Sequence, residues 1–171
     1  MDQGNDAPLI LTLEFDPATQ DWAQNMRSTH FPAARNIVPA HVTLFHALPS
    51  SCRDCIGANL ATLGEAPEIT IGAPYLLGRG VAYAMTTPDL ARLRADLVSV
   101  VGRERLTRQD AASWRPHLTV QNKVSPEQAR ALLADLQTAP PPVRCHAVAL
   151  RLWRYEGGPW TLLERFAFIT T

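Results

Sequence analysis

Two short stretches of the chain, His41-Val42-Thr43-Leu44 and Pro116-His117-Leu118-Thr119-Val120, share one pattern of histidine, apolar residue, threonine and apolar residue. On a β-strand, residues i and i+2 point to one face of the sheet and the residues between them point to the other. We therefore expect His41 and Thr43 to share a polar face, as do His117 and Thr119. The apolar residues of both stretches are expected to pack into the core.

The two stretches lie at matching places in a duplicated unit. The units cover about residues 8–79 and 80–171, and each is expected to run strand, helix, strand, helix, strand. A Ser, Thr or Asp side chain can cap the free N–H groups of a helix, and proline suits the first helical position. The predicted helix starts are Asp16-Pro17, Ser50-Ser51, Thr87-Pro88 and Ser125-Pro126, and the predicted unit-ending turns are Gly78-Arg79-Gly80 and Gly157-Gly158-Pro159.

This organisation predicts an α+β fold for the single domain 1–171. Glycine turns between neighbouring strands favour antiparallel hairpins over a purely parallel sheet. A duplicated unit of this kind is expected to pack about a pseudo-twofold axis, with helices outside and with sheets that line a central cleft between two lobes. Such an axis would bring the two polar strand faces together.

The composition excludes several classes of protein. The chain has 16 Lys+Arg and 16 Asp+Glu, so its net charge is zero, which argues against binding of long duplex nucleic acid by phosphate neutralisation. No apolar run approaches the roughly 20 residues of a membrane span. The N-terminal residues lack the basic flank of a signal peptide. We therefore expect a cytoplasmic monomer that binds a small or terminal ligand.

The three cysteines do not predict a metal site. Zinc at Cys52-x-x-Cys55 would need two further ligands, and Cys145-His146 is the one evident source. Adjacent residues of a strand point to opposite faces, so that pair would bind zinc poorly. We expect reduced thiols and neither a metal nor another cofactor.

Two imidazoles and two hydroxyls around one site suit phosphodiester chemistry. Histidine titrates near neutrality, so one neutral ring can accept a proton from a nucleophile and one protonated ring can donate a proton to the leaving oxygen. The threonine hydroxyls can donate hydrogen bonds to the non-bridging phosphate oxygens. A single His-x-Thr occurs by chance, but packing alone gives no reason for two copies at equivalent places.

The paired motifs resemble the His-x-Thr/Ser-x signatures of the two-histidine (2H) phosphoesterase superfamily, in particular its bacterial 2′-5′ RNA ligase-like branch. The tail Leu152-Trp153-Arg154-Tyr155-Glu156-Gly157-Gly158-Pro159-Trp160-Thr161-Leu162-Leu163 resembles the long strand, glycine-proline turn and final strand of that branch. The resemblance implies hydrolysis of 2′,3′-cyclic phosphates of RNA 3′ ends or nucleotides, with reversible 2′-5′ ligation. His41 and His117 would be the acid/base pair, and Thr43 and Thr119 would bind the phosphate.

Other residues are weaker candidates. Arg115 precedes the second motif and could bind a substrate phosphate, as could Arg103, Arg105 and Arg108 in the same loop. His46 is expected on the strand face opposite His41, as a packing or surface residue. Phe45-His46-Ala47 replaces the commoner Phe-Leu-Gly of the branch, which leaves the substrate open. The alternatives to an enzyme are a non-catalytic RNA-end or nucleotide-binding module and an accessory interaction domain.

Overall fold

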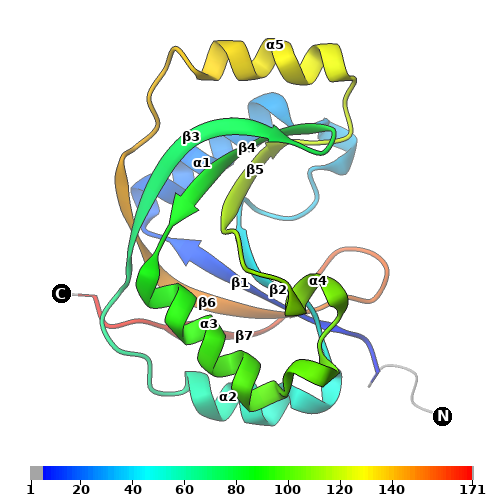
Figure 1. Cartoon of the computed structure of the whole chain (residues 1–171), viewed down its shortest axis with the longest axis vertical. Coiled ribbons are helices and arrows are strands. Elements are labelled where there is room, and N and C mark those ends of the chain that lie inside the picture. Colours follow the sequence, from blue (N-terminus) through cyan, green and yellow to red (C-terminus); the bar gives the residue numbers. More distant parts are fainter. Residues whose placement is uncertain (1–5, 171) are drawn as a thin grey trace.

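The computed structural model describes residues 6–170, which form an α+β fold with one antiparallel seven-stranded sheet (Figure 1). The predicted α+β class with antiparallel strands is therefore confirmed. The elements are β1 (Leu9–Phe15), α1 (Pro17–His30), β2 (Val42–Leu48), α2 (Arg53–Leu60), β3 (Glu68–Leu77), β4 (Gly80–Thr86), α3 (Pro88–Val101), α4 (Arg108–Ala111), β5 (His117–Gln121), α5 (Pro126–Leu136), β6 (Arg144–Arg154) and β7 (Thr161–Ala167).

The strand order shows how the two halves of the chain combine. The order is β2-β1-β6-β3-β4-β5, and β7 pairs with β6. β1 pairs with β2 of its own half and with β6 of the other. β4 likewise pairs with β5 of its own half and with β3 of the other. The first half therefore contributes β3 beside β4 and β5 of the second half, and the second half contributes β6 beside β1 and β2 of the first.

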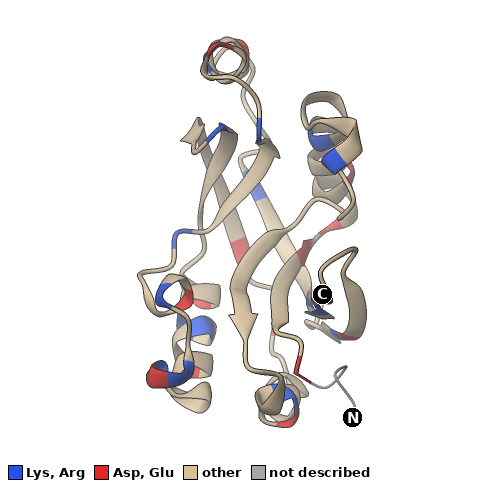
Figure 2. Ribbon diagram, turned by 90° about the vertical axis from the view of Figure 1, so that its right-hand side faces the viewer, with Lys and Arg blue, Asp and Glu red and all other residues tan. Residues whose placement is uncertain are grey.

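The helices also cross between the halves. α1 packs against β5 as well as β1, α5 packs against β3 and β4, and α2 packs against α3. Figure 1 shows α2 and α3 side by side at the bottom and α5 at the top. Figure 2 shows both acidic and basic residues on the helices. The buried faces of the strands supply most of the core.

Local sequence explains most helix starts. Asp16 accepts a hydrogen bond from the Thr19 N–H at 3.0 Å, and Ser125 forms a complete capping box with Gln128. The prediction for Ser50-Ser51 is wrong, because these residues form a 3₁₀ turn without a side-chain cap, and α2 begins at Arg53 and ends at Leu60. Pro49, which cannot donate a backbone hydrogen bond, precedes that turn.

The two predicted glycine turns connect antiparallel strands. Gly78 adopts a φ of 56° between β3 and β4, and Gly157 adopts a φ of 85° between β6 and β7. Gly80 has a different role, because a Cβ atom there would lie 1.8 Å from the carbonyl oxygen of Gln121. Glycine at this position lets β4 approach β5, the strand that carries the second motif.

Candidate active site

The two motif strands carry a β-bulge at the same position. In β2, Thr43 pairs with Thr12 and Phe45 pairs with Leu11, so Leu44 is the extra residue. In β5, Thr119 pairs with Ala82 and Gln121 pairs with Val81, so Val120 is the extra residue. A bulge changes the face to which the following side chains point. The equivalence of the two strands thus extends from the sequence pattern to the backbone.

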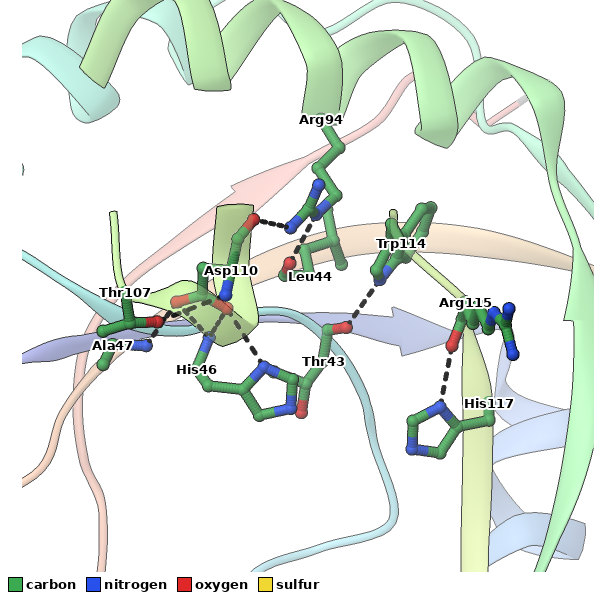
Figure 3. A network of polar contacts seen from close by, with 10 residues as sticks. All are labelled: Thr43, Leu44, His46, Ala47, Arg94, Thr107, Asp110, Trp114, Arg115 and His117. Atoms are coloured by element: carbon green, nitrogen blue, oxygen red, sulfur yellow. Dashed lines mark hydrogen bonds and ion pairs between the residues drawn. The ribbon is translucent and has the colours of Figure 1, made fainter. Parts of the chain in front are cut away.

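Each motif histidine makes the same hydrogen bond to its own backbone. Nδ1 of His41 lies 2.7 Å from the carbonyl oxygen of Pro39. Figure 3 shows the matching contact in the second motif, where Nδ1 of His117 lies 2.7 Å from the carbonyl oxygen of Arg115. A carbonyl oxygen only accepts hydrogen bonds, so Nδ1 carries the proton in both rings. The neutral form of each ring therefore presents an unprotonated Nε2, the atom that can accept a proton from a reacting group.

The backbone of each motif threonine is held by a side chain from the other half of the chain. Trp114 Nε1 donates to the carbonyl oxygen of Thr43 at 2.9 Å, and Arg27 Nη1 donates to that of Thr119 at 3.3 Å. Both threonines are partly exposed. Within residues 6–170, neither hydroxyl forms a hydrogen bond, so both are available to a ligand.

A buried arginine from each long helix stabilises the motif strand of the opposite half. Arg94 of α3 donates to the carbonyl oxygens of Leu44 at 2.7 Å and Asp110 at 2.6 Å, and its guanidinium lies 4.4 Å from the centre of the Phe45 ring. Arg27 of α1 donates through Nε to Asn36 at 2.8 Å in addition to its bond with Thr119. Burial lowers the pKa of both guanidinium groups. They remain charged near neutrality because an arginine pKa starts above 12.

The environment of His41 favours its neutral form. Burial lowers its pKa to about 4; the hydrogen bond to Pro39 opposes this shift, and positive charge on Arg27, His46 and His117 adds to it. The Trp160 ring lies 4.9 Å from the His41 ring, centre to centre. At neutral pH, His41 is therefore a proton acceptor rather than a donor.

The structure corrects the prediction for His46. The bulge at Leu44 shifts the alternation of β2, so His46 lies on the same face as His41 and Thr43 instead of the opposite face. Its Nδ1 lies 3.1 Å from Oδ1 of Asp110. A third imidazole therefore joins the four residues expected from the motifs.

The predicted arginines have different surroundings. The carbonyl oxygen of Arg115 holds His117, and its side chain is exposed, so a role in substrate binding stays a prediction. Arg103, Arg105 and Arg108 are all exposed, and Arg105 donates to Ser51 Oγ at 2.8 Å. A hollow of about 880 Å³ is lined by none of the four motif residues, whereas a much smaller one is lined in part by His41.

The cysteines are free thiols, and Cys52 and Cys145 are buried. Cys55 donates to the carbonyl oxygen of Cys52 at 3.0 Å. Among residues 6–170, no cluster of three or more His, Cys, Asp or Glu side chains could hold a metal ion. In the same residues, no helix combines the length and apolar character needed to cross a membrane.

The paired His-x-Thr strands lie within an antiparallel fold that is shared with two-histidine phosphoesterases. Residues 15–159 match the family described as the 2′-5′ RNA ligase superfamily. The chain belongs to this superfamily. Comparison with curated protein sequences finds no match.

Several solved structures share the fold. E. coli LigT in complex with NADP+ has a TM-score of 0.64 and 17% identity, and the match covers 96% of this chain and 99% of that one. E. coli LigT with 3′-AMP has a TM-score of 0.63 and 19% identity, and the match covers 95% of this chain and 98% of that one. TT0787 of Thermus thermophilus has a TM-score of 0.61 and 17% identity, and the match covers 94% of this chain and 97% of that one. At these identities the likeness establishes the fold.

Proposed function

We propose that this protein is a phosphodiesterase that opens 2′,3′-cyclic phosphates of RNA 3′ ends or nucleotides, and that the same site can carry out reversible 2′-5′ ligation when an RNA 5′-hydroxyl replaces water. The observation that carries the proposal is the pair of 2.7 Å bonds from Nδ1 of His41 and His117 to backbone carbonyl oxygens. These bonds leave both Nε2 atoms free, and the charge on His117 acts on His41, so we infer that the two rings and the two threonine hydroxyls share one phosphate. That set of groups covers both proton transfers and the contacts to the non-bridging oxygens.

The lowered pKa of His41 supports its assignment as the general base in ring opening. Nε2 of His41 accepts a proton from water as the water oxygen bonds to phosphorus. Protonated His117 gives its Nε2 proton to the ribose oxygen as the bond from phosphorus to that oxygen breaks. In ligation, the 5′-hydroxyl of a second RNA takes the place of water and the two roles stay the same; they exchange when the 2′-5′ linkage is cleaved back to the cyclic phosphate.

Thr43 and Thr119 bind the charge that develops on the phosphate. Their hydroxyls have no other partner within residues 6–170, and donors that are already aligned need no reorganisation when charge develops. The braces from Trp114 and Arg27 fix the backbone from which these hydroxyls project. These side chains supply every step, so we expect turnover to persist with a chelator present.

Two further observations support a small anionic substrate. The positive charges that lower the pKa of His41 also favour a bound anion. E. coli LigT, which shares the fold, has been solved with 3′-AMP and with NADP+. A monomeric state, action in the cytoplasm and phosphate binding by Arg115 remain predictions that accompany this proposal.

The test is incubation of the protein with an oligonucleotide that ends in a 2′,3′-cyclic phosphate, in the presence of a chelator. We expect conversion to a phosphomonoester end by the wild type, and loss of about 10²-fold or more in His41→Ala and His117→Ala. Binding without turnover by the wild type would instead support the non-catalytic RNA-end or nucleotide-binding module. Activity that disappears only when metal is removed would contradict the proposed chemistry.

A further inference from the structure

The third histidine of the site points to the same side as the motif residues. Figure 3 shows the His46 ring, the Thr43 side chain and the His117 ring directed to one side of their strands. The register agrees, because Thr43 pairs with Thr12 on this face and the bulge at Leu44 brings His46 back to it. The bulge residue Leu44 adds no advance along the partner strand. Two steps of about 3.3 Å therefore separate Thr43 from His46, which lies about 7 Å along β2 on the side away from His41.

His46 is oriented by a buried carboxylate. The Asp110 side chain is 1% exposed, whereas that of His46 is 39% exposed. Asp110 accepts hydrogen bonds from the backbone N–H of His46 at 2.9 Å and of Ala47 at 2.8 Å, in addition to its contact with the His46 ring. Burial alone would raise the pKa of Asp110, but the bonds from His46 and Ala47 outweigh it and hold that pKa below its ordinary value.

The carboxylate determines what His46 can offer a ligand. An ionised carboxylate only accepts hydrogen bonds, so Nδ1 of His46 carries a proton. With Nδ1 held by Asp110, Nε2 is the ring atom left for a ligand, and a proton on it makes the ring a positively charged donor. His41 and His117 differ in this respect, because their Nδ1 atoms face neutral carbonyl oxygens.

The equivalent position in the other motif strand has no such group. Counting five residues from each motif histidine past the equivalent bulges, Asn122 occupies the place of His46. The side-chain oxygen of Asn122 accepts the backbone N–H of Lys123 at 2.8 Å. The two motif strands are therefore alike at the histidines and threonines and differ beyond them, where one carries His46 on a buried carboxylate and the other carries Asn122.

We propose that His46, oriented by Asp110, is a specificity residue that binds the phosphodiester preceding the reacting phosphate, so that the site favours RNA 3′ ends over mononucleotides. The inference rests on the proposed function, because a cyclic phosphate at an RNA end always follows a second phosphate, whereas a cyclic mononucleotide lacks one. The asymmetry between His46 and Asn122 sets the side from which the RNA chain enters.

Binding of unreactive ligands tests this without turnover. The probes are adenosine 3′-monophosphate, with one phosphate, and the adenosine dinucleotide with a 3′-phosphate, with two. We expect His46→Gln to weaken binding of the dinucleotide roughly tenfold, the value of one charge-assisted hydrogen bond, and to change monophosphate binding less than twofold. His146→Gln, which alters an exposed histidine on β6, is the matched control and should change neither.

Equal losses for both probes would place His46 at the reacting phosphate and overturn the inference, as would no loss for either or no binding by the wild type. His46→Asn repeats the comparison in a second side chain if the glutamine variant fails to fold. Turnover of 2′,3′-cyclic AMP and of the dinucleotide 2′,3′-cyclic phosphate is measured in parallel. A wild type that binds the dinucleotide through His46 but opens neither cyclic substrate would refute the proposed function and leave the binding inference standing.

Discussion

Protonation of His41 should lower the free energy of unfolding of the protein in a defined pH range. Burial, together with positive charge on Arg27, His46 and His117, lowers the pKa of His41 to about 4, whereas histidine in an unfolded chain titrates near 6.5. The difference corresponds to at most roughly 3 kcal/mol. The ring is partly exposed, so solvent screening reduces the expected effect to about 1–2 kcal/mol.

The sign follows from where protons bind. Between pH 6.5 and about 4, the unfolded chain binds a proton at His41 and the folded chain does not, so the free energy of unfolding falls as the pH falls. This contribution is fully present above pH 6.5 and is lost as the pH drops through the folded-state pKa. The His41→Gln variant lacks it, so its stability relative to the wild type should improve on acidification.

Two assays measure this prediction. Urea unfolding at pH 7 and pH 4.5 should show a smaller acid loss for His41→Gln than for the wild type, by about 1–2 kcal/mol. His146→Gln, an exposed histidine, should behave as the wild type does. Proton NMR of the imidazole C–H signals should show that His41 stays neutral at pH 5.5. An NMR titration of His41 near pH 6.5, with no stability difference between the variants, would refute the reasoning.

Three stability predictions follow from buried contacts, all measurable by urea unfolding followed by circular dichroism. Arg94→Met leaves two buried carbonyl oxygens without donors and should lower the free energy of unfolding by about 3 kcal/mol. The control Arg92→Met, on the exposed face of the same helix, should lower it by less than about 0.5 kcal/mol. Equal losses in the two variants would contradict a stabilising role for Arg94. Gly80→Ala forces a Cβ against a backbone oxygen of β5 and should cost about 2–3 kcal/mol, while Gly64→Ala, with open space around it, should be tolerated. Ser125→Ala removes the capping box of α5 and should cost about 1 kcal/mol, and no change would show that the cap is unimportant.

The sequence predicts the elements well because their signals are local. The caps at Asp16 and Ser125 and the glycine turns act through neighbouring residues, and each lies where it was expected. The Ser50-Ser51 prediction failed because these serines lie within a 3₁₀ turn before α2, and neither caps the helix. The glycine turns also predicted the antiparallel hairpins β3–β4 and β6–β7, because a connection of a few residues leaves no room for a parallel crossover.

The missed features depend on contacts between distant residues. Nothing local marks Leu44 as a bulge, so simple strand alternation assigned His46 to the wrong face. Asp110, the partner of the His46 ring, is 64 residues away in the sequence. Arg94 was the exception, because its spacing from Leu90 and Leu97 places it on the buried face of α3, and a buried arginine needs polar partners. That signal could have been found in the sequence.

The account depends on His41 and His117 acting as one site, and a double-variant comparison tests this most directly. Rates of cyclic phosphate opening are measured for His41→Gln, His117→Gln and the double variant, with a chelator present. When two groups act as a unit, the effects of removing them do not add. We therefore predict that the rate falls about 10²–10⁴-fold in each single variant and by a similar factor in the double variant. Single variants within a few-fold of the wild type, or losses that multiply in the double variant, would show that the two motifs do not form one active site.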